Sequence, residues 1–506
     1  MFAALAASLF FTLTYATLAA KNRRAEIVLI PLLDVLQSVP ILGYLSFTVL
    51  FFVSLFPGRM LGPELAAVFA IFTSQAWNMA FSLYQSIRTV PRDLDEASRS
   101  FRLTSWQRFW RLEVPFAMPG LVWNTMMSMS GGWFFVVASE AISVGSLHIQ
   151  LPGIGSYVAT AIQNRDLVAI GWAIAAMAIV ILLYDQFFFR PIVAWADKYR
   201  VETTAAQIVP RSWVLDLFSR AAFVRRIWSP IGTAIDRFGR ARMILPHPAL
   251  QLRTRQIPER LVDVVWYGLI AALVGYIIWR LQGFAAGHIG WHDVQEVARD
   301  GGLTLTRVAV LIAIATVIWV PIGVAVGLRP RVAEKVQPIA QFLAAFPANL
   351  LFPIAVVTIV RYHLAPSIWL SPLMILGTQW YILFNVIAGA VAYPTDLREA
   401  AASFRVHGWR WWRFAMLPGI FPYYVTGAIT AAGGAWNASI VAEVASWGST
   451  TLNAGGLGSY IARMTTAGDF QRIALGVAMM SFIVVCLNRL IWRPLYAYGE
   501  RKTRLD

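Results

Sequence analysis

The sequence predicts an all-α integral membrane protein that is built from two tandem, parallel copies of one domain and holds about eleven transmembrane helices. Of its 506 residues, 58% are hydrophobic and 13% are charged, whereas soluble proteins carry about 25% charged residues. Apolar runs near the roughly 20 residues needed to cross the hydrocarbon core recur along the chain. The sequence also matches itself at an offset of 303 residues over more than a hundred positions, which indicates an internal repeat.

The first copy contains five expected spans, at residues 2–20, 31–56, 64–90, 119–144 and 167–189. No Lys or Arg precedes the first run and KNRR follows it, so a retained span with an outside N-terminus is favoured over a signal peptide. The second copy contains six expected spans, at residues 262–280, 304–328, 338–360, 367–390, 420–446 and 471–492. The first copy lacks a counterpart of 262–280, so either this start is the true one or the sequence begins late.

The expected domains are residues 1–200, residues 257–506, and a basic linker at 201–256 between them. Within the linker, residues 214–228 are amphipathic and basic, and an interfacial helix on the inner leaflet is preferred over a folded cytosolic domain. The net charge is +16, but the basic residues lie in the connections between spans. That distribution follows the positive-inside rule rather than the footprint of a nucleic-acid partner. Contact with membrane lipid is expected instead.

The sequence offers no catalytic, cofactor-binding or metal-binding residues. Its single cysteine, Cys486, excludes a disulfide framework and a thiolate metal cluster. No GxxxxGK[ST] phosphate-binding pattern and no HExxH zinc pattern occurs, so the chain itself is not expected to hydrolyse ATP. No nucleophile, base and orienting group can be assembled from the sequence, which argues against a membrane-embedded enzyme.

Two polar stretches, residues 93–120 and 396–419, interrupt the apolar chain at matching places. Asp93 with Glu96, and Asp396 with Glu399, have the spacing of a helix capping box. Three apolar positions follow on one helix face in each copy: Leu94, Ala97 and Phe101, and Leu397, Ala400 and Phe404. Such a face on a cytoplasmic loop needs a partner, or it packs on the inner surface of its own protein.

The sequence Glu96-Ala97-Ser98 with Pro115, repeated as Glu399-Ala400-Ala401 with Pro418, resembles the EAA motif of ABC transporter permeases. The resemblance is closest to the duplicated permease component of anion ABC transporters, in the nitrate, sulfonate and taurine group. It implies two fused type I permease domains whose motif helices dock in a groove on an ATPase subunit. The family has glycine at the seventh motif position, where this chain has Arg102 and Arg405.

The resemblance also implies the partners, the substrate class and the subcellular location. The partners are ABC ATPase subunits, as two copies or a heteropair, and an extracytoplasmic substrate-binding protein. The substrate is a small anion such as nitrate or a sulfonate, and the location is a bacterial-type inner membrane. Arg102 and Arg405 are suited to pair with carboxylates of the ATPase. The residues expected to couple to the ATPase are Asp93, Glu96, Ala97, Phe101, Arg102 and Pro115, with Asp396, Glu399, Ala400, Phe404, Arg405 and Pro418.

Candidate pathway residues come from the expected depth of polar and small residues. Gln75 and Gln379 lie roughly 17 Å into their spans at about 1.5 Å per residue, with Asn78 close by. Amides at that depth more often hold helices together than bind substrate, but they are the best pathway candidates in the sequence. The glycine pairs Gly131-Gly132 and Gly433-Gly434 lie midway along matching spans and are expected at the passage.

Two carboxylates, Glu140 and Glu443, lie near the expected outer face, where a charge costs less than at the membrane centre. We favour a structural role for both glutamates, in which they accept hydrogen bonds from the glycine-rich turn that follows. A gating role is the second choice. The main alternative for the whole chain is a secondary transporter or channel built from an internal repeat. That alternative gives no reason for a repeated exposed apolar helix on the cytoplasmic side.

Overall fold

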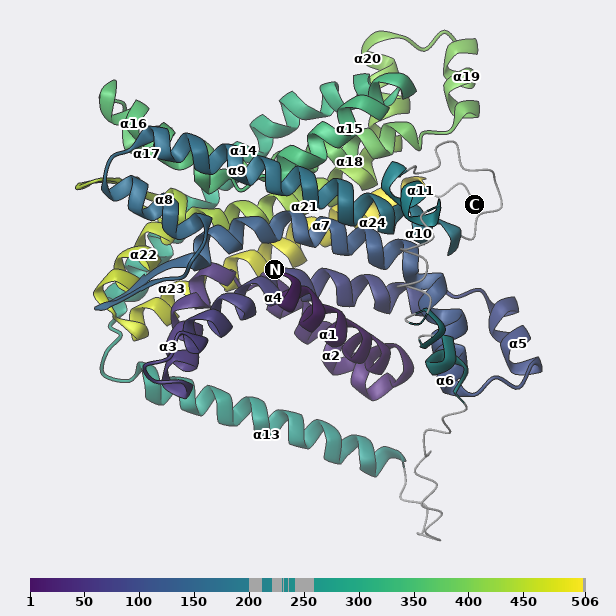
Figure 1. The fold of residues 1–506 in the computed structure, drawn as a ribbon, viewed down its shortest axis with the longest axis horizontal. Helices are drawn as coiled ribbons and strands as arrows, with labels where there is room; N and C mark the ends of the chain where they lie inside the picture. Colours follow the sequence, from purple (N-terminus) through teal and green to yellow (C-terminus); the bar gives the residue numbers. More distant parts are fainter. Residues whose placement is uncertain (200–211, 221–229, 231, 235, 242–258, 504–506) are drawn as a thin grey trace.

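The computed structural model describes residues 1–199, 212–220, 230, 232–234, 236–241 and 259–503. Long helices run in one common direction through the molecule (Figure 1). The helices and strands of the first copy are α1 (Phe2–Lys21), α2 (Arg23–Ser38), α3 (Ile41–Leu55), α4 (Leu61–Arg88), α5 (Arg92–Ser100), α6 (Ser105–Arg108), the π-helix η1 (Phe109–Glu113), α7 (Val114–Glu140), β1 (Ala141–Val144), β2 (Leu147–Gln150), α8 (Ile154–Gln163), α9 (Leu167–Tyr184), the π-helix η2 (Asp185–Phe189) and α10 (Arg190–Ala196).

The first copy ends with the short η3 (Asp197–Tyr199), and the linker contributes α11 (Trp213–Arg220). The second copy follows with α13 (Glu259–Ala285), α14 (Trp291–Gly327), α15 (Pro330–Ala345), η4 (Ala348–Leu351), α16 (Phe352–Arg361), α17 (Pro366–Trp369), η5 (Ser371–Met374), α18 (Trp380–Val391), α19 (Thr395–Ser403), α20 (Gly408–Trp411), the π-helix η6 (Trp412–Met416), α21 (Leu417–Ala442), β3 (Val444–Trp447), β4 (Thr450–Asn453), α22 (Leu457–Ala467), α23 (Phe470–Leu487), the π-helix η7 (Asn488–Trp492) and α24 (Arg493–Thr503).

The expected spans differ from the observed helices in number and in straightness. Among the described residues, seven helices are long and apolar enough to cross a membrane, or nine if each of two bent pairs counts as one span. The other two expected spans correspond to α7 and to α18, which has only 12 residues. The expected span at 367–390 is therefore not one continuous helix, because the proline-containing turns α17 and η5 interrupt it before α18 begins.

Each copy contains one sharply bent pair of helices where the sequence predicts a single span. The pair α2 and α3 bends by 99°, and the pair α15 with the following helix bends by 77°. The bends come just before Pro40 and Pro347, where Val39 and Phe346 take extended conformations. A proline disfavours the helical conformation of the residue before it, so the same sequence feature breaks the helix in both copies.

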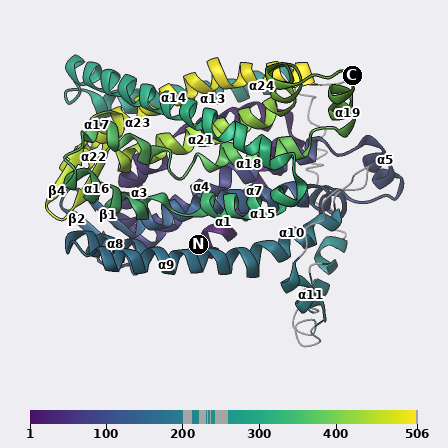
Figure 2. The ribbon, with the colours of Figure 1, turned by 90° about the horizontal axis from the view of Figure 1, so that it is seen from above.

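The repeat is visible in unusual local structure as well as in sequence. The π-helix at Phe109–Glu113 recurs at Trp412–Met416, and the one at Asp185–Phe189 recurs at Asn488–Trp492, each shifted by 303 residues (412 − 109 and 488 − 185). A β-hairpin of two four-residue strands follows α7, and another follows α21. The two hairpins lie at one end of the molecule, and α5 and α19 lie at the other (Figure 2). No strand was expected at either place.

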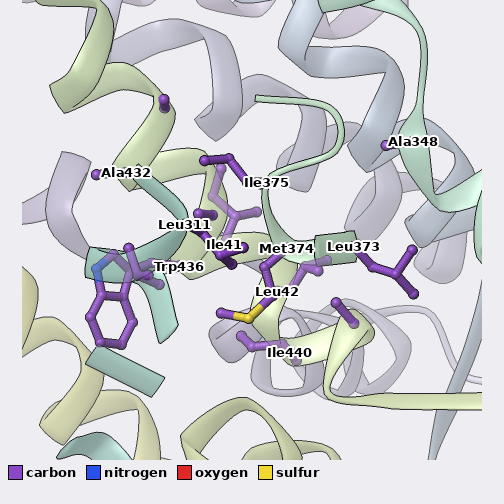
Figure 3. Packing of buried hydrophobic residues seen from close by; sticks show 14 of the residues in the cluster. Ile41, Leu42, Leu311, Ala348, Leu373, Met374, Ile375, Ala432, Trp436 and Ile440 are labelled. Atoms are coloured by element: carbon purple, nitrogen blue, oxygen red, sulfur yellow. The ribbon is translucent and has the colours of Figure 1, made fainter. Parts of the chain in front are cut away.

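The two copies share one apolar core. Its largest cluster joins residues of both copies, and Figure 3 shows Ile41 and Leu42 of α3 packed near Met374 and Trp436 of the second copy. The hairpins add a reciprocal contact. The amide of Gly145 donates to the carbonyl of Thr465, and the amide of Gly448 donates to the carbonyl of Ile162, both at 2.9 Å. The halves therefore interlock rather than lie side by side as separate bodies.

Helix α13 has no counterpart in the first copy and lies apart from the other helices (Figure 1). No residue of its apolar stretch is buried within the molecule. Its side chains, among them Val264, Leu269 and Trp279, are exposed along its length. An apolar helix of this length with every face exposed is suited to be surrounded by lipid.

Candidate docking loops and central cavity

The two repeated polar stretches fold into matching short helices, α5 and α19, at the same end of the molecule (Figures 1 and 2). Each helix ends with the same C-terminal turn. Leu103 N–H donates to the carbonyl of Ser98, and Val406 N–H donates to the carbonyl of Ala401, which is the long hydrogen bond of a Schellman motif. The residue that makes the turn is an arginine with positive φ, 52° at Arg102 and 51° at Arg405. The turn of the glycine-containing family motif is thus formed here by arginine.

The expected capping boxes at Asp93 and Asp396 are wrong. The N-cap residues of α5 and α19 are Pro91 and Pro394, and neither helix has a side-chain cap. Because each helix begins directly after its proline, the aspartate already lies inside the first turn and cannot serve as the cap. A capping box does form one helix later in the first copy, where Thr104 and Gln107 satisfy each other's backbone amides at the start of α6.

The apolar face of both docking helices is exposed. Phe101 is 79% exposed and Phe404 is 81% exposed, and Leu94 and Leu397 are also exposed. Asp93, Glu96, Asp396 and Glu399 are exposed too, Ala97 is exposed, Ala400 is half-buried, and Pro115 and Pro418 lie in the first turns of α7 and α21. The alternative in which this face packs on its own protein therefore does not hold for the described residues. We call Phe101, Phe404 and the helices that carry them the docking loops.

The first docking loop is held by charges. Arg108 of α6 lies 3.2 Å from Asp95 of α5 and 3.4 Å from Glu113, and Lys21 of α1 lies 2.7 Å from Glu113. In the second copy the positions of Arg108 and Glu113 hold Trp411 and Met416 (108 + 303 and 113 + 303). There the rings of Trp411 and Trp412 pack edge to face with their centroids 5.4 Å apart. The two loops have the same backbone turn, but ion pairs hold the first, whereas aromatic packing lies at the corresponding place in the second.

A piece of the linker packs on α6, the short helix that follows the first docking loop. The indole N–H of Trp106 donates to the carbonyl of Phe238 at 2.9 Å, and the side-chain amide of Gln107 donates to the carbonyl of Arg240 at 2.9 Å. The Phe238 ring also packs against Trp106 and Trp110. Trp409, which corresponds to Trp106, is 72% exposed. The interfacial helix expected at 214–228 falls partly on α11 and partly outside the described residues.

Between the two copies lies a cavity of about 300 Å³. Its wall combines aromatic rings with amides and hydroxyls, drawn from both copies. The polar residues of the wall are Asp34, Gln37, Ser38, Thr73, Ser74, Asn78, Ser130, Thr378, Tyr381, Thr430, Asn437 and Asn488. A cavity that both halves of an internal repeat enclose is the natural position for a passage along the axis that relates them.

Four of the seven expected pathway residues line this cavity: Asn78, Gly131, Gly433 and Gly434. The remaining three do not belong to its wall. Gln75 is fully buried against α1, where its carbonyl oxygen accepts a hydrogen bond from Ser8 at 3.4 Å, and Gly132 packs against Gln75. This placement fits the helix-holding role of intramembrane amides.

Gln379 does not lie deep within a helix, because it is the N-cap residue of α18. Its side-chain oxygen accepts a hydrogen bond from the indole N–H of Trp319 at 2.9 Å. The continuous helix from residue 367 onward, on which the depth estimate was based, is not what the structure contains. The interruption by α17 and η5 makes helical rise an invalid measure of depth for this residue.

The most informative cavity residue that the sequence did not single out is Tyr381. It corresponds to Asn78 in the repeat (78 + 303), and both line the cavity. A second missed feature is the ion pair between Asp34 of α2 and Arg493 of α24, which joins the two copies beside the cavity. Comparing the polar residues of one copy with their counterparts in the other is the signal that would have found Tyr381.

Glu140 and Glu443 both lie at the hairpin end, and each accepts a hydrogen bond from the turn after its hairpin. Gly155 N–H donates to Glu140 at 2.6 Å, and Ser459 N–H donates to Glu443 at 3.0 Å. Glu443 is fully buried and also pairs with Arg307 at 3.0 Å and with the hydroxyl of Thr304 at 2.8 Å. A buried carboxylate with this many donors holds the structure together, while the gating role stays a prediction.

One described group of side chains has ligand atoms close enough for a metal ion: His292, Asp293 and Glu296 lie within 4.8 Å of one another. Asp293 is already engaged, because it accepts hydrogen bonds from Arg472 and from the amide of Gly290. We therefore interpret this group as acidic residues in the first turns of α14 that are ion-paired with arginines, and not as a metal site.

Comparison with known proteins gives two matches to one family. The family described as binding-protein-dependent transport system inner membrane component matches residues 12–189 and 319–502, which is more than half of the chain. The bicarbonate transport system permease protein CmpB of Synechococcus elongatus is 28% identical over 188 residues, which are 37% of this chain and 64% of that protein. The nitrate import permease protein NrtB of Leptolyngbya laminosa is 24% identical over 188 residues, again 37% and 64%.

A third relative, the glycine betaine/carnitine transport permease protein GbuB of Listeria monocytogenes, is 31% identical over 169 residues, which are 32% of this chain and 52% of that protein. The chain thus spans less than two thirds of the length of each of these relatives. All three are transport permeases by name.

Proposed function

This chain belongs to the family of binding-protein-dependent transport system inner membrane components, and on that premise we propose that it is the permease subunit of an ABC importer. It is a multi-pass membrane protein. Residues 1–200 and 257–506 form two fused permease domains around one passage, and residues 201–256 connect them. The docking loops face the cytoplasm and receive ATPase subunits, on which ATP is hydrolysed.

One observation carries this proposal: two matching helices at the same end of the molecule each present an exposed phenylalanine, Phe101 and Phe404. Exposed apolar residues on a short helix are typical of helix-in-groove recognition. The internal repeat supplies two such helices, which suits a pair of ATPase subunits. Glu96, Glu399, Arg102 and Arg405 lie on the same helices or at their C-terminal turns and are exposed, so they are available to contact the same partner.

For the substrate we propose a small anion that an extracytoplasmic binding protein delivers. Support comes from the relatives, since two of those compared are named for bicarbonate and nitrate. The passage is the cavity between the copies, with Asn78, Gly131, Gly433 and Gly434 in its wall. Hydrolysis on the ATPases moves the docking loops and thereby switches the side from which this cavity is open.

The test uses the full chain expressed together with the ATPase encoded beside it. Phe101→Asp and Phe404→Asp place a charge on the exposed apolar face without disturbing a packed side chain. The double variant is expected to lose co-purification of the ATPase and ATP-dependent uptake, because a carboxylate cannot be buried in an apolar groove without a large cost. Glu96→Lys with Glu399→Lys tests the acidic side of the same helices.

The matched control is Tyr157→Asp, which changes an exposed aromatic residue of α8 at the opposite end of the molecule. This variant should retain the ATPase. Retention of the ATPase and of uptake by the double phenylalanine variant would disprove the docking role.

A further inference from the structure

We propose, on the basis of the permease function above, that Tyr381 and Asn78 form a hydrogen-bond donor site for the negatively charged oxygen atoms of a solute crossing the central cavity. The two residues come from corresponding places in the repeat, one on α4 and one on α18. Both line the cavity that the two copies enclose. The site takes a small oxyanion, or the carboxylate of a small zwitterion.

Tyr381 points its hydroxyl across the boundary between the copies. Its side chain is only 7% exposed, yet it lines the cavity, so the exposed part faces the interior space. A Cβ atom at Gly131 would lie 3.3 Å from the Tyr381 hydroxyl oxygen, which places this oxygen over the glycine of the opposite copy. Within the described chain the hydroxyl forms no hydrogen bond with another residue. The hydroxyl borders the cavity, so an oxygen atom of a solute there can accept the hydrogen bond that it donates.

Asn78 is already oriented by its neighbour. The side-chain amide nitrogen of Gln37 donates to the Asn78 oxygen at 3.1 Å, and Gln37 belongs to the cavity wall as well. With its oxygen turned toward Gln37, the NH₂ group of Asn78 is left as a donor on a residue that lines the cavity. Tyr381 and Asn78 therefore both offer donors, and an oxygen acceptor is the ligand atom that satisfies them.

The nearly uncharged wall of the cavity suits a solute that must bind and then be released. Among the described residues that line the cavity, only Asp34 carries a charge, and it is paired with Arg493. The part of the wall that the structure describes contains no lysine or arginine. Neutral donors bind an oxyanion more weakly than a fixed cation would, and transit requires binding that is weak enough to allow release.

The experiment measures initial uptake of labelled nitrate, bicarbonate and glycine betaine, each separately, in cells that carry the complete transporter. Tyr381→Phe removes only the hydroxyl oxygen, and Asn78→Leu removes the amide with little change in volume. Each is expected to lower kcat/KM for the transported solute about tenfold, as loss of a hydrogen bond to a charged acceptor predicts. The control is Tyr15→Phe, whose hydroxyl bonds the Leu29 carbonyl at 2.6 Å outside the cavity wall.

Uptake of nitrate or bicarbonate identifies an oxyanion solute, whereas uptake of glycine betaine alone identifies a carboxylate. Uptake that is unchanged in Tyr381→Phe and Asn78→Leu overturns the donor site. A wild-type transporter that imports none of the three solutes overturns the assigned solute chemistry. Co-purification of the ATPase is measured in parallel and should be the same in all variants. Its absence in the wild type would be a failure of the permease function and not of the donor site.

Discussion

At the scale of single residues, the most unusual positions are Arg102 and Arg405, where arginine adopts a conformation that favours glycine. This left-handed conformation costs a non-glycine residue about 1–2 kcal/mol. The same residue type bears that cost at the same turn in both docking loops. Both side chains are exposed at the end of a docking helix, beside Phe101 and Phe404. Contact with a partner at this place would offset the strain.

Replacing both arginines with glycine separates the turn from the charge. Arg102→Gly and Arg405→Gly should stabilise the two helix ends by about 1 kcal/mol each, because glycine adopts positive φ without strain. Hydrogen exchange at the amides of Leu103 and Val406, which close these turns, should then slow by about fivefold. If the guanidinium groups pair with carboxylates of the ATPase, co-purification of the ATPase should weaken despite this gain. Unchanged co-purification would remove the pairing.

Neighbouring glycines in α21 give a second prediction at this scale. A Cβ atom at Gly434 would lie 2.3 Å from Cγ2 of Thr378, whereas one at Gly433 would meet no atom within 4 Å. Gly434→Ala should therefore destabilise the fold by about 1–3 kcal/mol and slow uptake. Gly433→Ala is the matched control and should leave stability unchanged. Thermal unfolding of the purified variants in detergent measures the difference, and equal melting temperatures would contradict the close packing.

The residue scale also shows where the sequence sufficed. The position of the two glycine pairs midway along matching spans led us to expect them at one passage; Gly131, Gly433 and Gly434 line one cavity, whereas Gly132 does not, and their part in transport stays a prediction. The sequence could not reveal that Gln75 turns toward Ser8, because helical period alone does not say which neighbour occupies each face. Tyr381 was overlooked because a tyrosine in an apolar run looks like core until its counterpart, Asn78, is placed beside it.

At the scale of elements, prolines explain most differences between expectation and structure. Pro40 and Pro347 each break an expected span into a bent pair. Pro91 and Pro394 occupy the N-cap positions that the sequence assigned to aspartates. At Pro40 and Pro347 the restriction that proline imposes on the preceding residue ends the helix, whereas at Pro91 and Pro394 the extended proline is itself the cap after which the helix begins.

Two candidate N-caps can be compared directly, Asp93 for α5 and Thr104 for α6. Thr104→Ala should destabilise the start of α6 by about 1 kcal/mol, since the Thr104 side chain accepts the Gln107 amide. Asp93→Ala should have little effect on α5, whose N-cap is Pro91. Hydrogen exchange at the Gln107 amide reports the first change. Equal protection in both variants would show that the threonine does not cap the helix.

At the scale of the whole molecule, the two copies fold as one body. The shared core and the reciprocal contacts of Gly145 and Gly448 join them, and so does the ion pair of Asp34 and Arg493. The repeat predicted two domains with the same topology, which the two family matches support. It did not predict the interlock, because a match of the sequence with itself shows which positions correspond and not which positions touch across the two copies.

Cutting the linker tests this interlock. A protease site inserted between residues 242 and 258 should, after cleavage, leave the two halves bound to each other in mild detergent. The reason is that their common core is apolar and joins α3 with η5 and α21, and burial of apolar area is the main stabilising term. Size-exclusion chromatography should show one peak. Leu42→Asp places a charge in that core and should allow the cleaved halves to separate.

The linker segment seated on Trp106 has a wider consequence. It covers part of α6 and leaves Trp409, the counterpart of Trp106, open to solvent, although the two residues occupy matching places in the repeat. In a transporter assembled from two identical chains, every substitution falls on both sides of the axis at once. In this chain the two copies are encoded separately, so a substitution can alter α5 alone, or one wall of the central cavity, while the other copy serves as an internal reference.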